Sequence, residues 1–133
     1  MSIDKIQAAL ETAANSMVPP LPTAWRNVGF EPNEGVPWQR ITFLMGSPDH
    51  PGINSAYREK GIMRFSLFYP LRTGSSMARK RVDLIRSVFK RDTSFLKDEV
   101  CVVVDKAPEI ADESVTDWFS LVVDVRFRSD VTI

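Results

Sequence analysis

The sequence predicts an α+β domain: a mixed, mainly antiparallel sheet of about five strands with two helices packed on one face. Two periodicities lead to this prediction. Apolar residues recur at helical spacing in residues 3–17 and 77–90, whereas residues 61–70 and 118–128 alternate between apolar and polar side chains, as half-buried strands do. The expected order is helix, strand, strand, strand, helix, strand, strand, in a single domain over residues 1–133.

The N-terminal part begins with the first expected helix. Its apolar stripe consists of Ile3, Ile6, Leu10, Ala13 and Met17. The helix must end before Pro19 and Pro20, because proline lacks the amide hydrogen that a helix needs. Residues 25–30 are predicted to form a short strand, and residues 38–45 a second one. One side of the second strand carries Gln39, Ile41, Phe43 and Met45.

The middle of the chain contains a long polar loop, a strand and a helix. The loop is expected over residues 46–60, and loops of this length without structure of their own usually have a function or are disordered. The third strand follows, and its apolar side consists of Met63, Phe65, Leu67 and Tyr69. The second helix packs through a stripe that consists of Ala78, Val82, Ile85 and Phe89. Its other side is strongly basic.

The C-terminal part is expected to hold the last two strands. Residues 100–105 predict the fourth strand, because residues 100–104 form an apolar run that ends at Asp105. The single cysteine, Cys101, lies in this run and is therefore expected to be a buried, inert thiol. An acidic loop over residues 106–116 then leads to the fifth strand, residues 118–128.

Charge is balanced overall but unevenly distributed. The chain has 17 basic and 17 acidic residues, so its net charge gives no argument for a nucleic-acid partner. Residues 79–91 contain Arg79, Lys80, Arg81, Arg86, Lys90 and Arg91. Residues 105–117 contain Asp105, Glu109, Asp112, Glu113 and Asp117. Two opposite patches on a neutral chain predict self-association.

Signatures of catalysis and metal binding are lacking in the sequence. The only histidine, His50, lies in the segment S-P-D-H-P-G at residues 47–52, whose composition is explained by turn formation. One histidine and one distant cysteine do not make a zinc site. We therefore expect no enzymatic activity, no metal and no cofactor. The sequence has neither a signal peptide nor an apolar run of the roughly 18 residues that cross a membrane, so a soluble protein of the cytoplasm is expected.

Three further features occur together and in a fixed order. They are the N-terminal amphipathic helix, the segment W-R-N-V-x-F-x-P-x-x-G-x-P-W-x-R at residues 25–40, and the segment G-I-M-R-F-S-L-F-Y-P-L-R-T-G-S-S-M-A at residues 61–78. The last of these runs into the helix that ends at Phe89. In this combination the chain resembles the tail terminator, or tail completion, proteins of long-tailed bacteriophages and prophages.

The resemblance implies a structural virion assembly protein, not an enzyme, built as an α+β subunit. Such subunits assemble into a six-membered ring that caps the tail tube, ends tail polymerisation and offers a surface for head–tail joining. The implied partners are further copies of the chain, the tail tube protein and a head–tail connector protein. The protein is then expected in the host cytoplasm during assembly and afterwards in the virion tail.

A ring requires a heterologous interface, in which one patch of each subunit meets a different patch of the next. We expect the basic helix and the acidic loop to supply these patches. The residues expected to take part are Arg79, Arg86, Lys90, Asp112 and Glu113. The long polar loop is expected to contact the tube or the connector. The residues expected there are Asp49, His50, Asn54, Tyr57 and Arg58.

Two other functions remain open at this point. A nucleic-acid-binding module would use the basic helix, residues 77–91, and would bind DNA with a steep salt dependence. A small-ligand-binding or enzymatic domain would use a pocket between sheet and helices, where perturbed ionisable groups converge.

Overall fold

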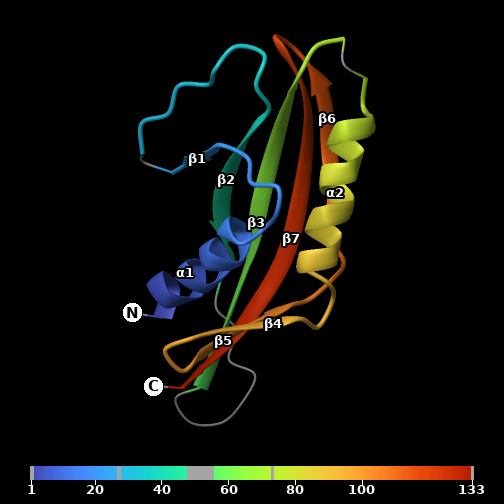
Figure 1. Cartoon of the computed structure of the whole chain (residues 1–133). Helices are drawn as coiled ribbons and strands as arrows, with labels where there is room; N and C mark the ends of the chain where they lie inside the picture. Colours follow the sequence, from blue (N-terminus) through green and yellow to red (C-terminus); the bar gives the residue numbers. More distant parts are fainter. Residues whose placement is uncertain (1, 27, 48–55, 73, 133) are drawn as a thin grey trace.

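The computed structural model describes residues 2–26, 28–47, 56–72 and 74–132, with backbone only for residues 2, 56, 57, 131 and 132. The helices of these parts of the chain are α1 (Ser2–Asn15) and α2 (Ser76–Val88). The strands are β1 (Thr23–Trp25), β2 (Trp38–Met45), β3 (Ala56–Pro70), β4 (Ser94–Lys97), β5 (Val100–Val104), β6 (Glu109–Val115) and β7 (Trp118–Thr132). Together the strands form one curled, mixed sheet (Figure 1).

A long antiparallel ribbon of β3 and β7 forms the centre of the sheet. The two strands pair along their full 15 residues, from Ala56 opposite Thr132 to Pro70 opposite Trp118. One edge of β3 pairs with β2, which in turn pairs with β1 in parallel. The free edge of β7 is shared, because β6 pairs with its first half and β5 with its second half. The strand order is β1-β2-β3-β7-β5-β4, with β6 beside β7.

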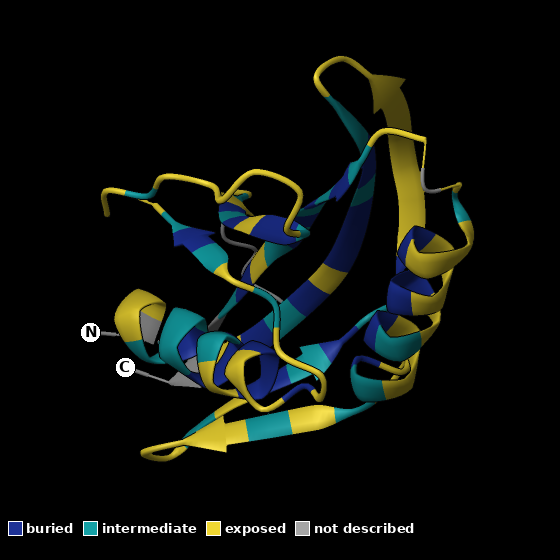
Figure 2. Ribbon diagram, turned by 45° about the horizontal axis from the view of Figure 1, so that its top comes forward, coloured by how far each residue is buried: buried dark blue, intermediate teal, exposed yellow. Residues whose placement is uncertain are grey.

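One core lies inside the curl of the sheet (Figure 2). The inner side of β3 consists of Met63, Phe65, Leu67 and Tyr69, all buried as their alternation predicted. The inner side of β7 consists of Leu121, Val123, Val125 and Phe127. The second helix, α2, contacts β3 and β7, whereas α1 contacts β4 and β5. The two helices therefore lie on different parts of the curled sheet (Figures 1 and 2).

The predicted fold class, α+β with about five strands and both helices on one face, is wrong. The described part of the chain is mostly β, with seven strands in a sheet that curls around the core. Strands β4 and β6 were not predicted. All seven residues of β6 are exposed, so its side chains show none of the apolar alternation that identifies a strand. Backbone pairing with β7 makes it a strand instead.

Several boundaries and one burial prediction also need correction. The short first strand is residues 23–25 rather than 25–30, and it adds to the sheet edge in parallel. The predicted loop over residues 46–60 ends earlier, because β3 already begins at Ala56. Cys101 is exposed rather than buried. Its neighbours in β5, Val102 and Val104, face the core, and strand alternation turns Cys101 outward relative to Val102.

Candidate functional site

The basic residues of α2 lie in three different settings. Arg79 is exposed and its guanidinium donates to the hydroxyl of Ser75 one turn earlier. Arg86 donates from Nε to the backbone oxygen of Pro108, at 2.9 Å, and so holds the chain just before β6 against the helix. Lys90 is exposed and lies beyond the end of the helix at Val88. The hydrogen bond of Arg79 stays within the N-terminal turn of α2, whereas that of Arg86 links the helix to a distant segment of its own subunit. Arg79 and Lys90 are therefore the better candidates for contact with a partner.

The acidic residues expected to face the basic helix do not form one patch. Asp112 pairs with Val122 and Glu113 with Leu121 on the neighbouring strand, so the two carboxylates point to opposite sides of β6. Asp112 lies on the outer side near Arg64, whose pKa is raised chiefly by its hydrogen bond to Asp124 and to a smaller extent by the charge of Asp112. Glu113 lies on the side of the core residue Leu121, and both carboxylates are exposed.

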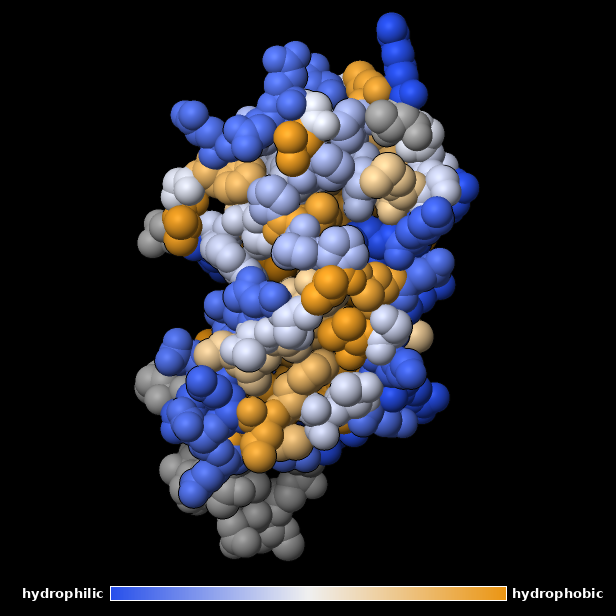
Figure 3. Space-filling view, in the orientation of Figure 1, coloured by the Kyte–Doolittle hydropathy of each residue, from blue (hydrophilic) through white to orange (hydrophobic). Residues whose placement is uncertain are grey.

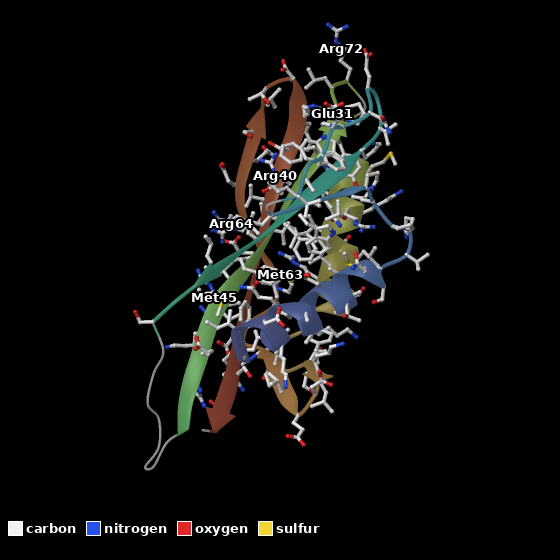
Figure 4. All side chains as sticks on the ribbon, turned by 90° about the vertical axis from the view of Figure 1, so that its left-hand side faces the viewer. Glu31, Arg40, Met45, Met63, Arg64 and Arg72 are labelled. Atoms are coloured by element: carbon white, nitrogen blue, oxygen red, sulfur yellow. The ribbon has the colours of Figure 1, made fainter. Side chains whose placement is uncertain are left out.

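The outer side of the central ribbon carries ion pairs between strands. Arg64 and Asp124 form two hydrogen bonds, Nε to Oδ1 at 2.8 Å and Nη2 to Oδ2 at 3.0 Å. Arg64 and its neighbour Met63 project to opposite sides of β3 (Figure 4). The other pairs on this side are Arg58–Asp130, Arg126–Glu109 and Arg128–Asp105. Within each of these pairs the two opposite charges neutralise each other.

The residues expected to contact the tube are only partly described. Asp49, His50 and Asn54 lie outside the described residues. Tyr57 belongs to β3, and its side chain is not described. Arg58 also belongs to β3 and donates from Nε to Oδ1 of Asp130 at 2.7 Å. The hydrogen bond from Arg58 to the carboxylate is the largest cause that lowers the pKa of Asp130, and Coulomb attraction adds to it.

An apolar groove of about 400 Å³ lies between α2 and residues 18–21; we call it the Arg81 groove. Val18 and Met77, which line it, are 77% and 57% exposed, and Tyr69 and Leu84 also contribute to its walls. Figure 3 shows hydrophobic side chains gathered across the middle of the face that carries α1 and α2, with hydrophilic ones at its margins. Exposed apolar surface of this kind marks sites where proteins bind partners.

A buried arginine gives the groove its polar character. Arg81 is only 5% exposed, and its guanidinium donates through Nη1 to the backbone oxygen of Pro19. Its Nε has no hydrogen-bond partner among the described residues. Burial lowers the pKa of Arg81, an effect that Tyr69 partly offsets. A count of charges alone groups Arg81 with the basic patch. Its spacing, three residues from Ala78 and four from Ile85, places it on the buried stripe of the helix and is the sequence signal for its burial.

The described residues offer little that would serve catalysis. No group of three or more His, Cys, Asp and Glu residues among them is placed to hold a metal ion. A second, open groove of about 820 Å³ between α1, β1 and β2 contains Glu11. Burial raises the pKa of Glu11, and the neighbouring charge of Asp4 adds to this shift.

Among the helices of the described residues, none is long and apolar enough to cross a membrane.

Comparisons with known proteins give a consistent result. A family model described as phage tail terminator protein matches residues 5–127. This match confirms the resemblance that rests on residues 25–40 and 61–78. One solved structure has 24% sequence identity, covers 100% of this chain and 97% of its own, and superimposes with a TM-score of 0.72, which establishes a shared fold. No curated protein matches the chain.

Proposed function

Because the chain belongs to the phage tail terminator protein family, we propose that it forms a ring that caps the tail tube. The family consists of structural virion proteins, and the chain is accordingly a component of a phage tail. The finer proposal is a homo-oligomer of six subunits that stops tube polymerisation and presents a joining surface to the head. The family match over residues 5–127 carries this proposal, since it covers nearly the whole chain.

The surfaces of the subunit support a head-to-tail ring. A heterologous interface needs two unlike surfaces on one subunit. One consists of Arg79 on α2, Lys90 just beyond its C-terminal end, and the exposed apolar residue Met77. The other is the exposed strand β6 with Asp112 and Glu113. We propose that α2 of one subunit faces β6 of the next, with Arg86 contributing chiefly to the position of β6 within its own subunit.

The connection between β2 and β3 is proposed to contact the tube or the connector. Its contact residues are proposed to be Asp49, His50 and Asn54, together with Tyr57 and Arg58 at the start of β3. The proposed partners are the tail tube protein and a head–tail connector protein of the same phage. Assembly takes place in the host cytoplasm, and the finished ring remains in the virion tail.

The capping activity can be measured on the length of tail tubes. Tail tube protein that polymerises alone should give tubes of widely scattered length. Addition of the purified chain during growth should stop elongation and leave a cap at one end of each tube. Tubes that keep growing past saturating amounts of the chain would rule the proposal out. Cys101→Ser is a suitable reference protein, because it removes the exposed thiol and hence disulfide-linked aggregates.

A further inference from the structure

We propose that the Arg81 groove receives the tip of the β6–β7 hairpin, residues 115–117, from a second copy of this chain. The inference rests on the proposed ring and specifies the contact that builds it. It follows from three properties of the groove and from a segment of the same chain that matches them.

The first property of the groove is its exposed apolar rim. Val18 and Met77 are large apolar side chains that are more than half exposed, and they border a cavity with other apolar walls. Contact with water is unfavourable for such a surface, and an apolar side chain inserted between these two residues would remove it from water. The occupant therefore carries at least one exposed apolar residue.

The second property is a buried hydrogen-bond donor without a partner. The Nε of Arg81 has no acceptor among the described residues, although the side chain is almost fully buried. Buried donors in proteins nearly always find an acceptor, and each exception calls for an explanation. An occupant that brings a backbone carbonyl or a carboxylate to the groove would satisfy this donor after a shift of the Arg81 side chain, because Nε is closed to solvent in the single subunit.

The third property is positive charge at the rim. Lys80 is exposed and lines the groove beside Arg81. Two cationic side chains favour an occupant with negative charge close to its apolar residue. The occupant is thus an apolar residue with acidic neighbours and free carbonyl groups.

The tip of the β6–β7 hairpin has this composition. Val115 is 67% exposed, and the carboxylates of Glu113 and Asp117 lie on either side of it in the sequence. Strand β6 pairs only with β7 among the described strands, so the hairpin stands at the margin of the sheet (Figure 2). Pairing of Val115 with Phe119 fixes the tip within its own subunit, which leaves the groove open for another copy.

The contact joins two different surfaces of identical subunits. Each subunit then offers one tip and one groove, so that every subunit in a ring uses both. A contact of this kind is heterologous, and its repetition gives a closed ring when the rotation between neighbours is a whole fraction of a full turn. The contact also places the acidic residue Glu113 of one copy near α2 of the next, which agrees with the charge complementarity proposed above.

Disulfide cross-linking between two single-cysteine variants tests this contact. Both variants carry Cys101→Ser; one adds Val18→Cys at the groove and the other adds Val115→Cys at the tip. The two proteins are mixed with tail tubes under conditions in which the reference protein assembles, oxidised, and run on a non-reducing gel. We expect a cross-linked dimer in the mixture and none in either variant alone.

A matched control uses Val28→Cys in place of Val18→Cys. Val28 is 63% exposed, close to the exposure of Val18, but it lines the groove on α1 and β2 instead. Mixed with the Val115→Cys variant, it should give no dimer.

The outcomes separate the contact from the ring. No dimer in the first mixture, while electron microscopy shows rings in the same sample, would overturn the proposed contact and leave the ring intact. Equal dimer in the Val28 control, or in one variant alone, would also overturn it. Failure of the reference protein to assemble on tubes would contradict the proposed function itself, and this inference with it.

Discussion

Arg64 and Asp124 face each other across the two longest strands of the fold and share two hydrogen bonds of 2.8 and 3.0 Å. The side chain of Asp124 is 5% exposed, whereas that of Arg64 is 37% exposed. The pair therefore satisfies a nearly buried carboxylate from the solvent side. It also links β3 to β7, and the pairing of β7 with β6 positions the hairpin tip.

Removal of the guanidinium tests this role. Arg64→Ala would leave the Asp124 carboxylate buried without its charged partner, so the free energy of unfolding should fall by about 1–3 kcal/mol. Arg126→Ala is the matched control, since Arg126 pairs with Glu109 at 3.3 Å and both side chains are about half exposed. Exposed pairs contribute about 0–1 kcal/mol. Equal losses in urea unfolding would show that burial of Asp124 does not matter.

Close packing at Gly61 gives a second prediction. A Cβ atom at this position would lie 2.7 Å from Cζ of Phe127 and 2.9 Å from the backbone oxygen of Leu44. Gly61→Ala should therefore lower the free energy of unfolding by about 1–3 kcal/mol, as overpacking does. Thermal unfolding measures the effect.

The control for this prediction is Gly46→Ala. A Cβ atom at Gly46 would meet its nearest neighbour, the backbone oxygen of Lys60, at an ordinary 3.5 Å. This variant should unfold close to the wild-type temperature. The double variant Gly61→Ala with Phe127→Leu should lose less stability than the sum of the two single variants, because the smaller side chain relieves the contact. A loss equal to that sum would argue against the steric explanation.

The sequence predicted the elements that use side-chain burial and missed those that do not. Residues 38–45 matched β2 and the stripe from Ala78 to Phe89 matched α2, because their buried residues recur at strand or helix spacing. Strand β6 could not be predicted in this way, since only its backbone pairing with β7 makes it a strand. A count of charges likewise does not distinguish Arg81 from the exposed basic residues. Its helical spacing does, because it places Arg81 on the buried stripe.

Tyr69 should make stability depend on alkaline pH. Burial raises the pKa of its phenol, and the nearby Arg81 partly opposes this. The unfolded phenol loses its proton near pH 10, roughly its ordinary pKa, whereas the folded one keeps it to higher pH. Stability is therefore fully present below about pH 10 and falls above it, by at most about 1.4 kcal/mol per pH unit.

Tyr69→Phe isolates this contribution. Urea unfolding at pH 8.5 and pH 11 should show a smaller loss of stability for Tyr69→Phe than for the wild type, because phenylalanine has no phenol to ionise. The other titrating groups contribute equally to both proteins. Identical losses would mean that the phenol ionises alike in the folded and unfolded chains.

Charge reversal on α2 should weaken assembly without unfolding the subunit. Arg79→Glu combined with Lys90→Glu changes two exposed residues and spares Arg86, whose contact with Pro108 lies within one subunit. The concentration needed for assembly should rise about tenfold or more, which corresponds to roughly 1.4 kcal/mol. Sedimentation velocity measures this shift.

Two further variants make the charge prediction specific. Asp112→Lys with Glu113→Lys, added to the reversed helix, should restore part of the assembly. Arg26→Glu with Lys97→Glu changes net charge equally at exposed positions outside α2 and β6, and should leave assembly near the wild-type concentration. Rings that form normally with the reversed helix would exclude the electrostatic contribution.

The connection between β2 and β3 should matter for joining rather than for folding. Alanine at Asp49, His50 and Asn54 should leave the unfolding temperature and ring formation unchanged, because the role proposed for these residues is contact with the tube or the connector. Infectious particles should drop strongly, and unjoined heads and capped tails should accumulate. A wild-type titre of infectious particles from this triple variant would show that these three residues do not take part in joining.

Electron microscopy of negatively stained tail tubes, with and without the purified chain, tests most directly whether the chain works as a terminating ring. Our account predicts rings that sit on one end of each tube and, at high protein concentration, free rings of the same diameter. Bare tube ends with the chain remaining as single subunits would contradict it.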